Sequence, residues 1–243
     1  MCTASLITRY ETEPGYRFVF NRDELRSRAT GEPPKWREFG PVRAICPRDP
    51  DAGGTWIATS DRGLTLAVTN LNPTPGPVIP DGVKLRSRGS IVPMLITATG
   101  ASEAVSLVRS DDLEAFAPFR LLAVEAAHDG ILLLEARWDR EHWVVQKRSE
   151  LPTCFASSGL GDDRVESRRA LFRHLQVRTP ADQDRFHAHR WPDRPETSVM
   201  MSRADARTVS VTTVEVMRRR PGFDIRMEYR SVPDLEVATR SVV

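Results

Sequence analysis

The chain contains little cysteine, little lysine and almost no net charge. Its 243 residues include three cysteines, widely separated and in no CxxC pair, which predicts neither a disulfide framework nor a zinc site. A net charge of +2 argues against a nucleic-acid partner. Arginine far outnumbers lysine, and because the arginines are scattered among acidic residues we attribute this bias to a GC-rich bacterial genome.

Long apolar runs are also missing from the sequence. No window approaches the run of about 18 apolar residues that a membrane helix needs. Residues 1–9 lack the basic start, apolar stretch and cleavage site of a secretory signal, so we expect a cytoplasmic protein. The composition, 40% hydrophobic and 28% charged, is typical of a soluble globular protein, and the length favours a single domain over residues 1–243.

Short β-rich runs separated by turn signals open the chain. Ala4–Arg9 and Tyr16–Asn21 predict a first hairpin around a Pro-Gly turn. Thr55–Thr59 and Leu64–Thr69 predict a second hairpin around a polar turn that ends in glycine.

Loops and helices are predicted between these runs and after them. The polar stretch Arg22–Arg43 and the proline-rich stretch Leu71–Asp81 predict long irregular loops. The apolar spacing within Ser87–Arg109 predicts two helical segments broken near Gly100. Asp162–Val177 carries an apolar stripe and predicts one further helix.

Strand patterns return in the second half of the chain. Arg120–Ala126, Ile131–Ala136 and His142–Lys147 predict a three-stranded antiparallel meander, and Val209–Val216 and Phe223–Tyr229 predict two last strands. Because these strands group around helices without βαβ alternation, the pattern predicts an α+β fold with helices layered on antiparallel sheets.

Cys2 stands next to the initiator methionine. Removal of Met1 would leave a thiol and an α-amine on one residue, with pKa values of about 8.5 and about 7.7–8.0. Such an amine can act as the base for its own side chain, as in N-terminal nucleophiles. The alternative interpretation is that Cys2 is an ordinary strand residue.

Five short motifs occur in a fixed order and spacing. They are Met1-Cys2-Thr3, Asn21-Arg22-Asp23-Glu24, the stretch from Arg48 to Trp56, Thr69-Asn70 and Ser87-Arg88-Gly89. Together they resemble the motifs of the NRDE (Transport and Golgi organisation protein 2) family, closely over the first third of the chain. The resemblance implies an N-terminal nucleophile hydrolase-like αββα sandwich, with two antiparallel sheets layered with helices.

The resemblance also implies a set of catalytic residues, because the family is similar to choloylglycine hydrolases and penicillin acylases. These enzymes cleave non-peptide amides with an N-terminal cysteine. Cys2 would be the nucleophile, with Arg22 and Asp23 orienting the amine and the thiolate. Asn70 would donate to the oxyanion, a role in which one lost donor costs ~10²–10³ in rate.

Two later positions complete the implied site. Ser158 lies in a segment that resembles one in which the family usually carries asparagine, so a shorter donor stands there. Arg207 falls where these folds place a late arginine.

Several of these residues also have structural explanations. Arg22 and Asp23 could pair with each other to fasten the loop that follows them. Gly53-Gly54 is expected to permit a positive φ or a close backbone approach. Trp56 is expected to pack in the core with its N–H satisfied at an edge, and Ser87 to cap a helix.

Two further motifs raise the question of a bound ligand. Cys46-Pro47 resembles a haem-binding dipeptide, although a cysteine that ends a strand before a turn explains it more simply. The pair His187 and His189 is interpreted as a solvated helix face rather than a zinc site.

Two functional hypotheses follow, beside the possibility of a structural relic with neither activity. The first is an N-terminal-nucleophile hydrolase-like protein that cleaves a small non-peptide amide or acyl compound through Cys2, without a cofactor. The alternative is a haem- or small-ligand-binding and trafficking protein of the same family, without catalysis.

Overall fold

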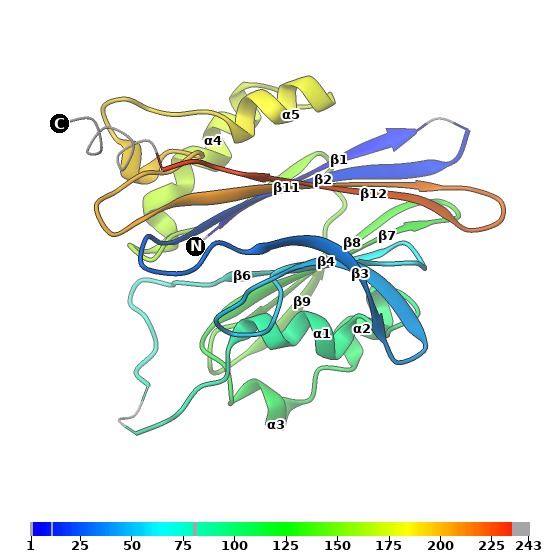
Figure 1. Cartoon of the computed structure of the whole chain (residues 1–243), viewed down its shortest axis with the longest axis horizontal. Coiled ribbons are helices and arrows are strands. Elements are labelled where there is room, and N and C mark those ends of the chain that lie inside the picture. The colour runs from blue at the N-terminus through cyan, green and yellow to red at the C-terminus, as the bar shows by residue number, and fades with distance from the viewer. Residues whose placement is uncertain (1, 11, 80–81, 235–243) are drawn as a thin grey trace.

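Two antiparallel sheets make up most of the chain. The computed structural model describes residues 2–10, 12–79 and 82–234. In these ranges a five-stranded sheet has the order β10-β1-β2-β11-β12, and a seven-stranded sheet runs from β3 to β9 in sequence order (Figure 1). The strands are β1 Cys2–Tyr10, β2 Pro14–Leu25, β3 Glu32–Phe39, β4 Val42–Arg48, β5 Ile57–Ser60, β6 Leu64–Asn70, β7 Phe119–Ala127, β8 Gly130–Trp138, β9 Trp143–Lys147, β10 Thr153–Ser157, β11 Ala206–Arg218 and β12 Phe223–Ser231.

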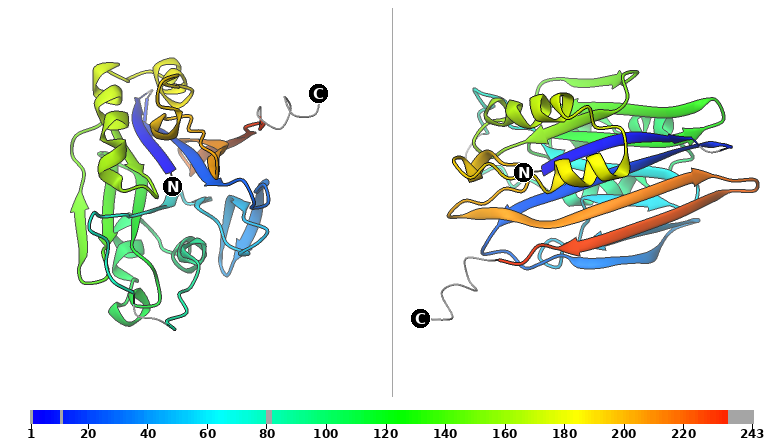
Figure 2. Two further views of the ribbon diagram at one scale, coloured as in Figure 1. Left: turned by 90° about the vertical axis from the view of Figure 1, so that its left-hand side faces the viewer. Right: turned by 90° about the horizontal axis from the view of Figure 1, so that it is seen from above.

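Helices cover the outer faces of the two sheets (Figures 1 and 2). The helices are α1 Ile91–Leu95, α2 Ala101–Ser106, α3 Ser110–Leu113, α4 Glu166–His174 and α5 Pro180–His187, with 3-10 turns η1 Arg88–Ser90, η2 Asp162–Val165 and η3 Pro195–Thr197. One apolar core lies between the sheets, a second lies under α1 to α3 and a third lies under α4 and α5. This arrangement confirms the predicted αββα sandwich, whereas a single domain over residues 1–243 stays a prediction.

Side chains of β1 alternate between two layers of the sandwich. Leu6 is buried in the core between the sheets. Thr3 accepts a hydrogen bond from Arg168 of α4, and Ser5 accepts one from Gln183 of α5. Because strand side chains point alternately to opposite faces, even-numbered positions of β1 face the other sheet and odd-numbered positions face the helices.

Most elements predicted from periodicity are confirmed. The two early hairpins are β1–β2 and β5–β6, the meander is β7–β8–β9, and the last two strands are β11 and β12. The predicted pair of helices is α1 and α2, separated near Gly100. Ser87 caps η1 by accepting the Gly89 N–H, and the predicted helix over Asp162–Val177 is η2 followed by α4.

The predicted loop over Arg22–Arg43 is wrong, because β2 continues to Leu25 and β3 occupies Glu32–Phe39. Proline is tolerated in β3 because this strand lies at the edge of its sheet and its register shifts between Glu32 and Lys35. Leu71–Ile79 carries no helix or strand, as predicted, while the end of that predicted loop, residues 80 and 81, lies outside the described residues.

Within the described ranges, no helix is long and apolar enough to cross a membrane.

The predicted solvated helix face around His187 is also wrong. His187 ends α5 with 2% of its surface exposed, and its Nδ1 lies 2.8 Å from the Asn21 side-chain oxygen. Its Nε2 lies 2.7 Å from the Ser5 hydroxyl. Burial lowers the pKa of His187 to about 3, so the imidazole is neutral and anchors α5 to β1 and β2.

We expect the protein to lose stability as the pH falls from 6.5 toward 3. The unfolded chain takes up a proton at His187 below its ordinary pKa of 6.5, while the folded protein binds it only near pH 3. The loss from this one group at pH 5 is about 2 kcal/mol. Urea unfolding at neutral and acidic pH measures it, and His187→Gln should remove this part of the pH dependence.

His174→Gln, at an exposed position of α4, serves as the control and should keep the wild-type pH dependence. The same pH dependence in His187→Gln and wild type would contradict the expectation.

Candidate active site

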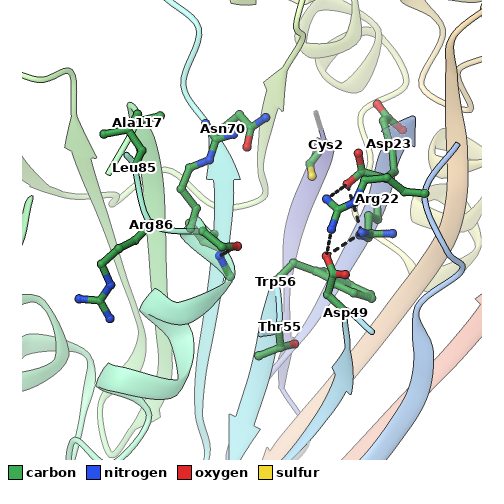
Figure 3. Close-up of a pocket in the computed structure, with 16 residues that line it drawn as sticks. Cys2, Arg22, Asp23, Asp49, Thr55, Trp56, Asn70, Leu85, Arg86 and Ala117 are labelled. Carbon is green, nitrogen blue, oxygen red and sulfur yellow. Dashed lines mark hydrogen bonds and ion pairs between the residues drawn. The ribbon is translucent and has the colours of Figure 1, made fainter. Parts of the chain in front are cut away.

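A pocket of about 350 Å³ opens where β1, β2, β6 and η1 meet (Figure 3). Cys2 lines it from β1, Arg22 from β2 and Asn70 from the end of β6, and Asp23 also borders it. Figure 3 shows Asn70 and Cys2 projecting toward this pocket from two different strands. The structure therefore brings together four of the six residues that the sequence predicts for the site.

Cys2 is held on both sides by neighbouring strands. It pairs with Arg22 of β2 and with Ser157 of β10, and its N–H donates to the Ser157 hydroxyl at 3.1 Å. Only 6% of its surface is exposed. Burial raises the pKa of the thiol and the nearby Asp23 charge adds to this, while Arg22 and a backbone hydrogen bond from Asp23 act in the opposite direction. The thiol therefore needs a base to become a nucleophile.

Arg22 is fixed by charge and by an aromatic ring. Its Nη2 lies 3.1 Å from a Glu24 oxygen and 3.2 Å from an Asp49 oxygen, and its guanidinium carbon lies 4.5 Å from the centre of the Trp56 ring. Its Nη1 is buried and has no partner among the described residues. Arg22 thus offers a rigid positive charge with one uncommitted donor.

The predicted edge hydrogen bond of Trp56 is wrong. The side chain packs in the core between the sheets, 6% exposed, as expected. Its Nε1 is buried without a hydrogen-bond partner in the described part of the chain. Trp56 instead presents its ring face to Arg22, a cation–π contact.

Asp23 does not pair with Arg22, because consecutive residues of β2 point to opposite faces of the sheet. Its carboxylate lies 3.1 Å from Arg168 of α4 and accepts the Thr208 hydroxyl at 2.6 Å. The two paired side chains are 0% and 1% exposed. The structural explanation of an Arg22–Asp23 pair is therefore wrong, and Asp23 reaches the pocket through its backbone.

Asn70 supplies an amide to the pocket without competing contacts. It is the last residue of β6 and is half-buried. Its side chain makes no hydrogen bond to another described residue, so the amide N–H₂ is available to a carbonyl oxygen in the pocket.

Ser158 and Arg207 do not line this pocket. The Ser158 hydroxyl accepts the Leu160 N–H at 3.1 Å. Arg207 donates to the Val232 carbonyl and pairs with Asp234, beside a different cavity. The residue that contacts Cys2 from β10 is Ser157, which the sequence did not single out.

A backbone contact between two of the motifs closes one wall. The Thr55 N–H donates to the Gly89 carbonyl at 2.9 Å, and a Cβ on Gly54 would lie 2.4 Å from that oxygen. Gly53 has a φ of +71°. Both expectations for the glycine pair are therefore confirmed, because one glycine takes a positive φ and the other permits close approach.

Cys46 lines a separate cavity of about 360 Å³ and is 2% exposed. Burial raises the pKa of its thiol, which disfavours the thiolate that would ligate iron. Haem binding stays a prediction. In the described ranges no group of three or more His, Cys, Asp or Glu side chains is placed to hold a metal ion.

The sequence model of the Transport and Golgi organisation 2 family matches residues 1–186. The chain belongs to this family. A comparison with curated proteins gave no match.

Solved structures show which fold this chain shares. Penicillin V acylase from Agrobacterium tumefaciens superposes with a TM-score of 0.52 at 11% identity, covering 96% of this chain and 86% of the acylase. The Caenorhabditis elegans ortholog of N-acylethanolamine-hydrolyzing acid amidase gives the same score and identity, covering 86% and 91%. These likenesses confirm the N-terminal nucleophile hydrolase-like fold.

We expect Arg168→Leu to lower the free energy of unfolding by about 3–5 kcal/mol, because it leaves the Asp23 carboxylate buried without its counter-charge. Urea denaturation measures the change. Arg173→Leu on the same helix, where the side chain is 71% exposed, should change it by less than about 0.5 kcal/mol. A cost for Arg168→Leu as small as that of the control would show that the buried pair does not hold α4 on the sheet.

Proposed function

We propose that the protein is a cysteine hydrolase of the N-terminal nucleophile type that cleaves a small non-peptide amide or related acyl compound. The observation that carries the proposal is the convergence of the Cys2 thiol, the Arg22 guanidinium and the Asn70 amide on one pocket. The reaction class is supported by the fold, which the chain shares with a penicillin V acylase and an amidase ortholog. We further propose that the protein acts in the cytosol and that its partner is a small molecule.

Removal of Met1 would start the chemistry by freeing the α-amine of Cys2. The amine takes the thiol proton, and the thiolate sulfur attacks the carbonyl carbon of the substrate to form a C–S bond. The carbonyl oxygen becomes an oxyanion, which the Asn70 amide stabilises as a hydrogen-bond donor. Collapse of this intermediate breaks the C–N bond, and the departing amine takes the proton from the α-ammonium group.

Hydrolysis of the thioester completes the cycle. The α-amine takes a proton from water, whose oxygen attacks the acyl carbon, and the C–S bond breaks to release the acid and restore the thiol. Arg22 stabilises the thiolate by its charge and keeps its position because Glu24 and Asp49 hold one end of the guanidinium.

We expect Cys2→Ala to abolish hydrolysis and Asn70→Ala to lower kcat by ~10²–10³, because each removes a group that acts on the reacting carbonyl. A panel of N-acyl aminocoumarins and N-acyl amino acids provides the substrates. Cys154→Ala is the control and should retain wild-type activity, because Cys154 packs under the helices α4 and α5 and does not line the pocket.

Processing is tested separately by the intact mass of natively expressed protein. The mass should correspond to a chain that begins at Cys2. Retention of Met1 across the whole population would reject the mechanism, as would an unchanged rate in Cys2→Ala.

Binding of a small ligand without chemistry is the second candidate. It is favoured by the burial of the Cys2 thiol, whose pKa is raised, and by the commitment of the Asp23 carboxylate to Arg168. A protein of this kind would keep the pocket as a ligand cavity and would not depend on removal of Met1.

The haem form of this candidate predicts a saturable Soret shift when purified protein is titrated with haem. Cys2→Ala or Cys46→Ala should remove the shift if either thiol contacts the iron, and Cys154→Ala should not. The lack of saturable binding at micromolar haem would count against a haem ligand.

A further inference from the structure

The acidic side chains around the Cys2 pocket are already committed to other residues. Glu24 and Asp49 each pair with Arg22 and with Arg28, at distances of 2.8 to 3.2 Å. The third carboxylate, that of Asp23, is turned into the sheet–helix layer. Two arginine charges are therefore neutralised on this wall, and the described lining residues offer no further acidic group to the opposite wall.

Arg86 and Arg88 form that opposite wall, and neither contacts a carboxylate within the described residues. Arg86 is exposed and lies over the Phe116 ring, with its guanidinium carbon 5.3 Å from the ring centre. Figure 3 shows it turned away from Cys2. Of the two arginines on this wall, Arg88 is therefore the one that remains available to a ligand in the Cys2 pocket.

Arg88 is half-buried with most of its donors unused. Its Nη1 donates to the Pro118 carbonyl at 3.0 Å, and the guanidinium makes no other hydrogen bond to the described residues. Arg88 lines the same pocket as Cys2. Burial lowers the pKa of Arg88, while the charges of Cys2 and Glu24 act in the opposite direction. A partly desolvated charge is unfavourable unless an opposite charge accompanies it.

The position of Arg88 is fixed by backbone contacts. The neighbouring Gly89 carbonyl accepts the Thr55 N–H, and the Gly89 N–H donates to the Ser87 hydroxyl. Because Gly54 lacks a Cβ, η1 packs directly on the segment before β5. Arg88 is therefore presented to the pocket by a rigid turn.

We propose that Arg88 binds an anionic group, a carboxylate or a phosphate, on the small molecule that occupies the Cys2 pocket. The planar guanidinium matches both anions with paired N–H donors, and such charge-assisted hydrogen bonds are the strong ones. The inference rests on the proposed function for the site and narrows its substrate to an amide that carries a negative charge beyond the scissile bond.

Alkylation of Cys2 by an anionic and by a neutral reagent tests the proposed role of Arg88 without substrate turnover. Purified protein is treated with iodoacetate, which is anionic, and with iodoacetamide, which is neutral, and peptide mass mapping follows modification at Cys2 separately from Cys46 and Cys154. Arg88→Gln should lower the ratio of the iodoacetate rate to the iodoacetamide rate about tenfold. The ratio is the informative quantity, because any change in the thiol pKa affects both reagents.

Matched variants separate this role from a structural one. Arg86→Gln should leave the ratio of the two alkylation rates near the wild-type value. Arg88→Lys should give a ratio between that of wild type and that of Arg88→Gln. Added salt should lower the wild-type ratio as well, so the test does not depend on how well Arg88→Gln folds. An unchanged ratio in Arg88→Gln and at high salt would overturn the proposal, as would no alkylation of Cys2 by either reagent.

Protection of Cys2 from iodoacetamide then distinguishes the anions. An N-acylglycine carries the carboxylate, an N-acyl phosphoethanolamine carries the phosphate, and an N-acylglycinamide is the neutral control. The proposal expects at least one anionic compound to protect more strongly than the neutral one, and that advantage to disappear in Arg88→Gln. Equal protection by all three would contradict it, whereas a protein that hydrolyses none of them would contradict only the proposed function.

Discussion

The buried ion pair between Asp23 and Arg168 ties the helical layer to the centre of the five-stranded sheet. The Arg168 guanidinium also donates to the Thr3 hydroxyl and to the Thr197 carbonyl, and the Thr208 hydroxyl donates to Asp23. One charge pair therefore joins three strands, α4 and the turn that contains Thr197. Because the paired side chains are almost completely buried, the groups around them must satisfy every polar atom.

The alternation of β2 gives the motif Asn21-Arg22-Asp23-Glu24 two separate tasks. Asn21 and Asp23 face the helices, where they bind His187 and Arg168. Arg22 and Glu24 face the pocket. Half of the motif thus assembles the molecule and half supplies charge next to Cys2. Strand geometry, with its period of two, explains why four consecutive polar residues are needed at one place.

The strands and helices that depend on short sequence patterns could be predicted from the sequence. The hairpins, the meander and α1 and α2 follow from periodicity and turn residues. The edge strand β3 was missed because Pro33 and Pro34 suit a loop, and only its place at the sheet edge makes them acceptable. The sequence likewise could not reveal the burial of His187, because its partners Ser5 and Asn21 lie more than 160 residues away along the chain.

Only part of the candidate site could be predicted from the sequence. Cys2, Arg22 and Asn70 could be placed through the family resemblance, and the pocket contains all three. Ser158 and Arg207 lie elsewhere, and the residue that contacts Cys2 is Ser157, one position earlier. A shift of one residue along a strand reverses which face a side chain occupies, so a resemblance without register cannot settle such a position.

The close contact between Gly54 and Gly89 means that packed main-chain atoms of two segments form one border of the cavity. Gly54 cannot carry a Cβ without separating the two segments, because that atom would lie 2.4 Å from the Gly89 carbonyl oxygen. Other parts of the lining are formed by residues with side chains, such as Val68, Leu85 and Ala117. One border of the cavity is consequently set by main-chain packing, whereas the size of the cavity at the other positions depends on the side chains that line it.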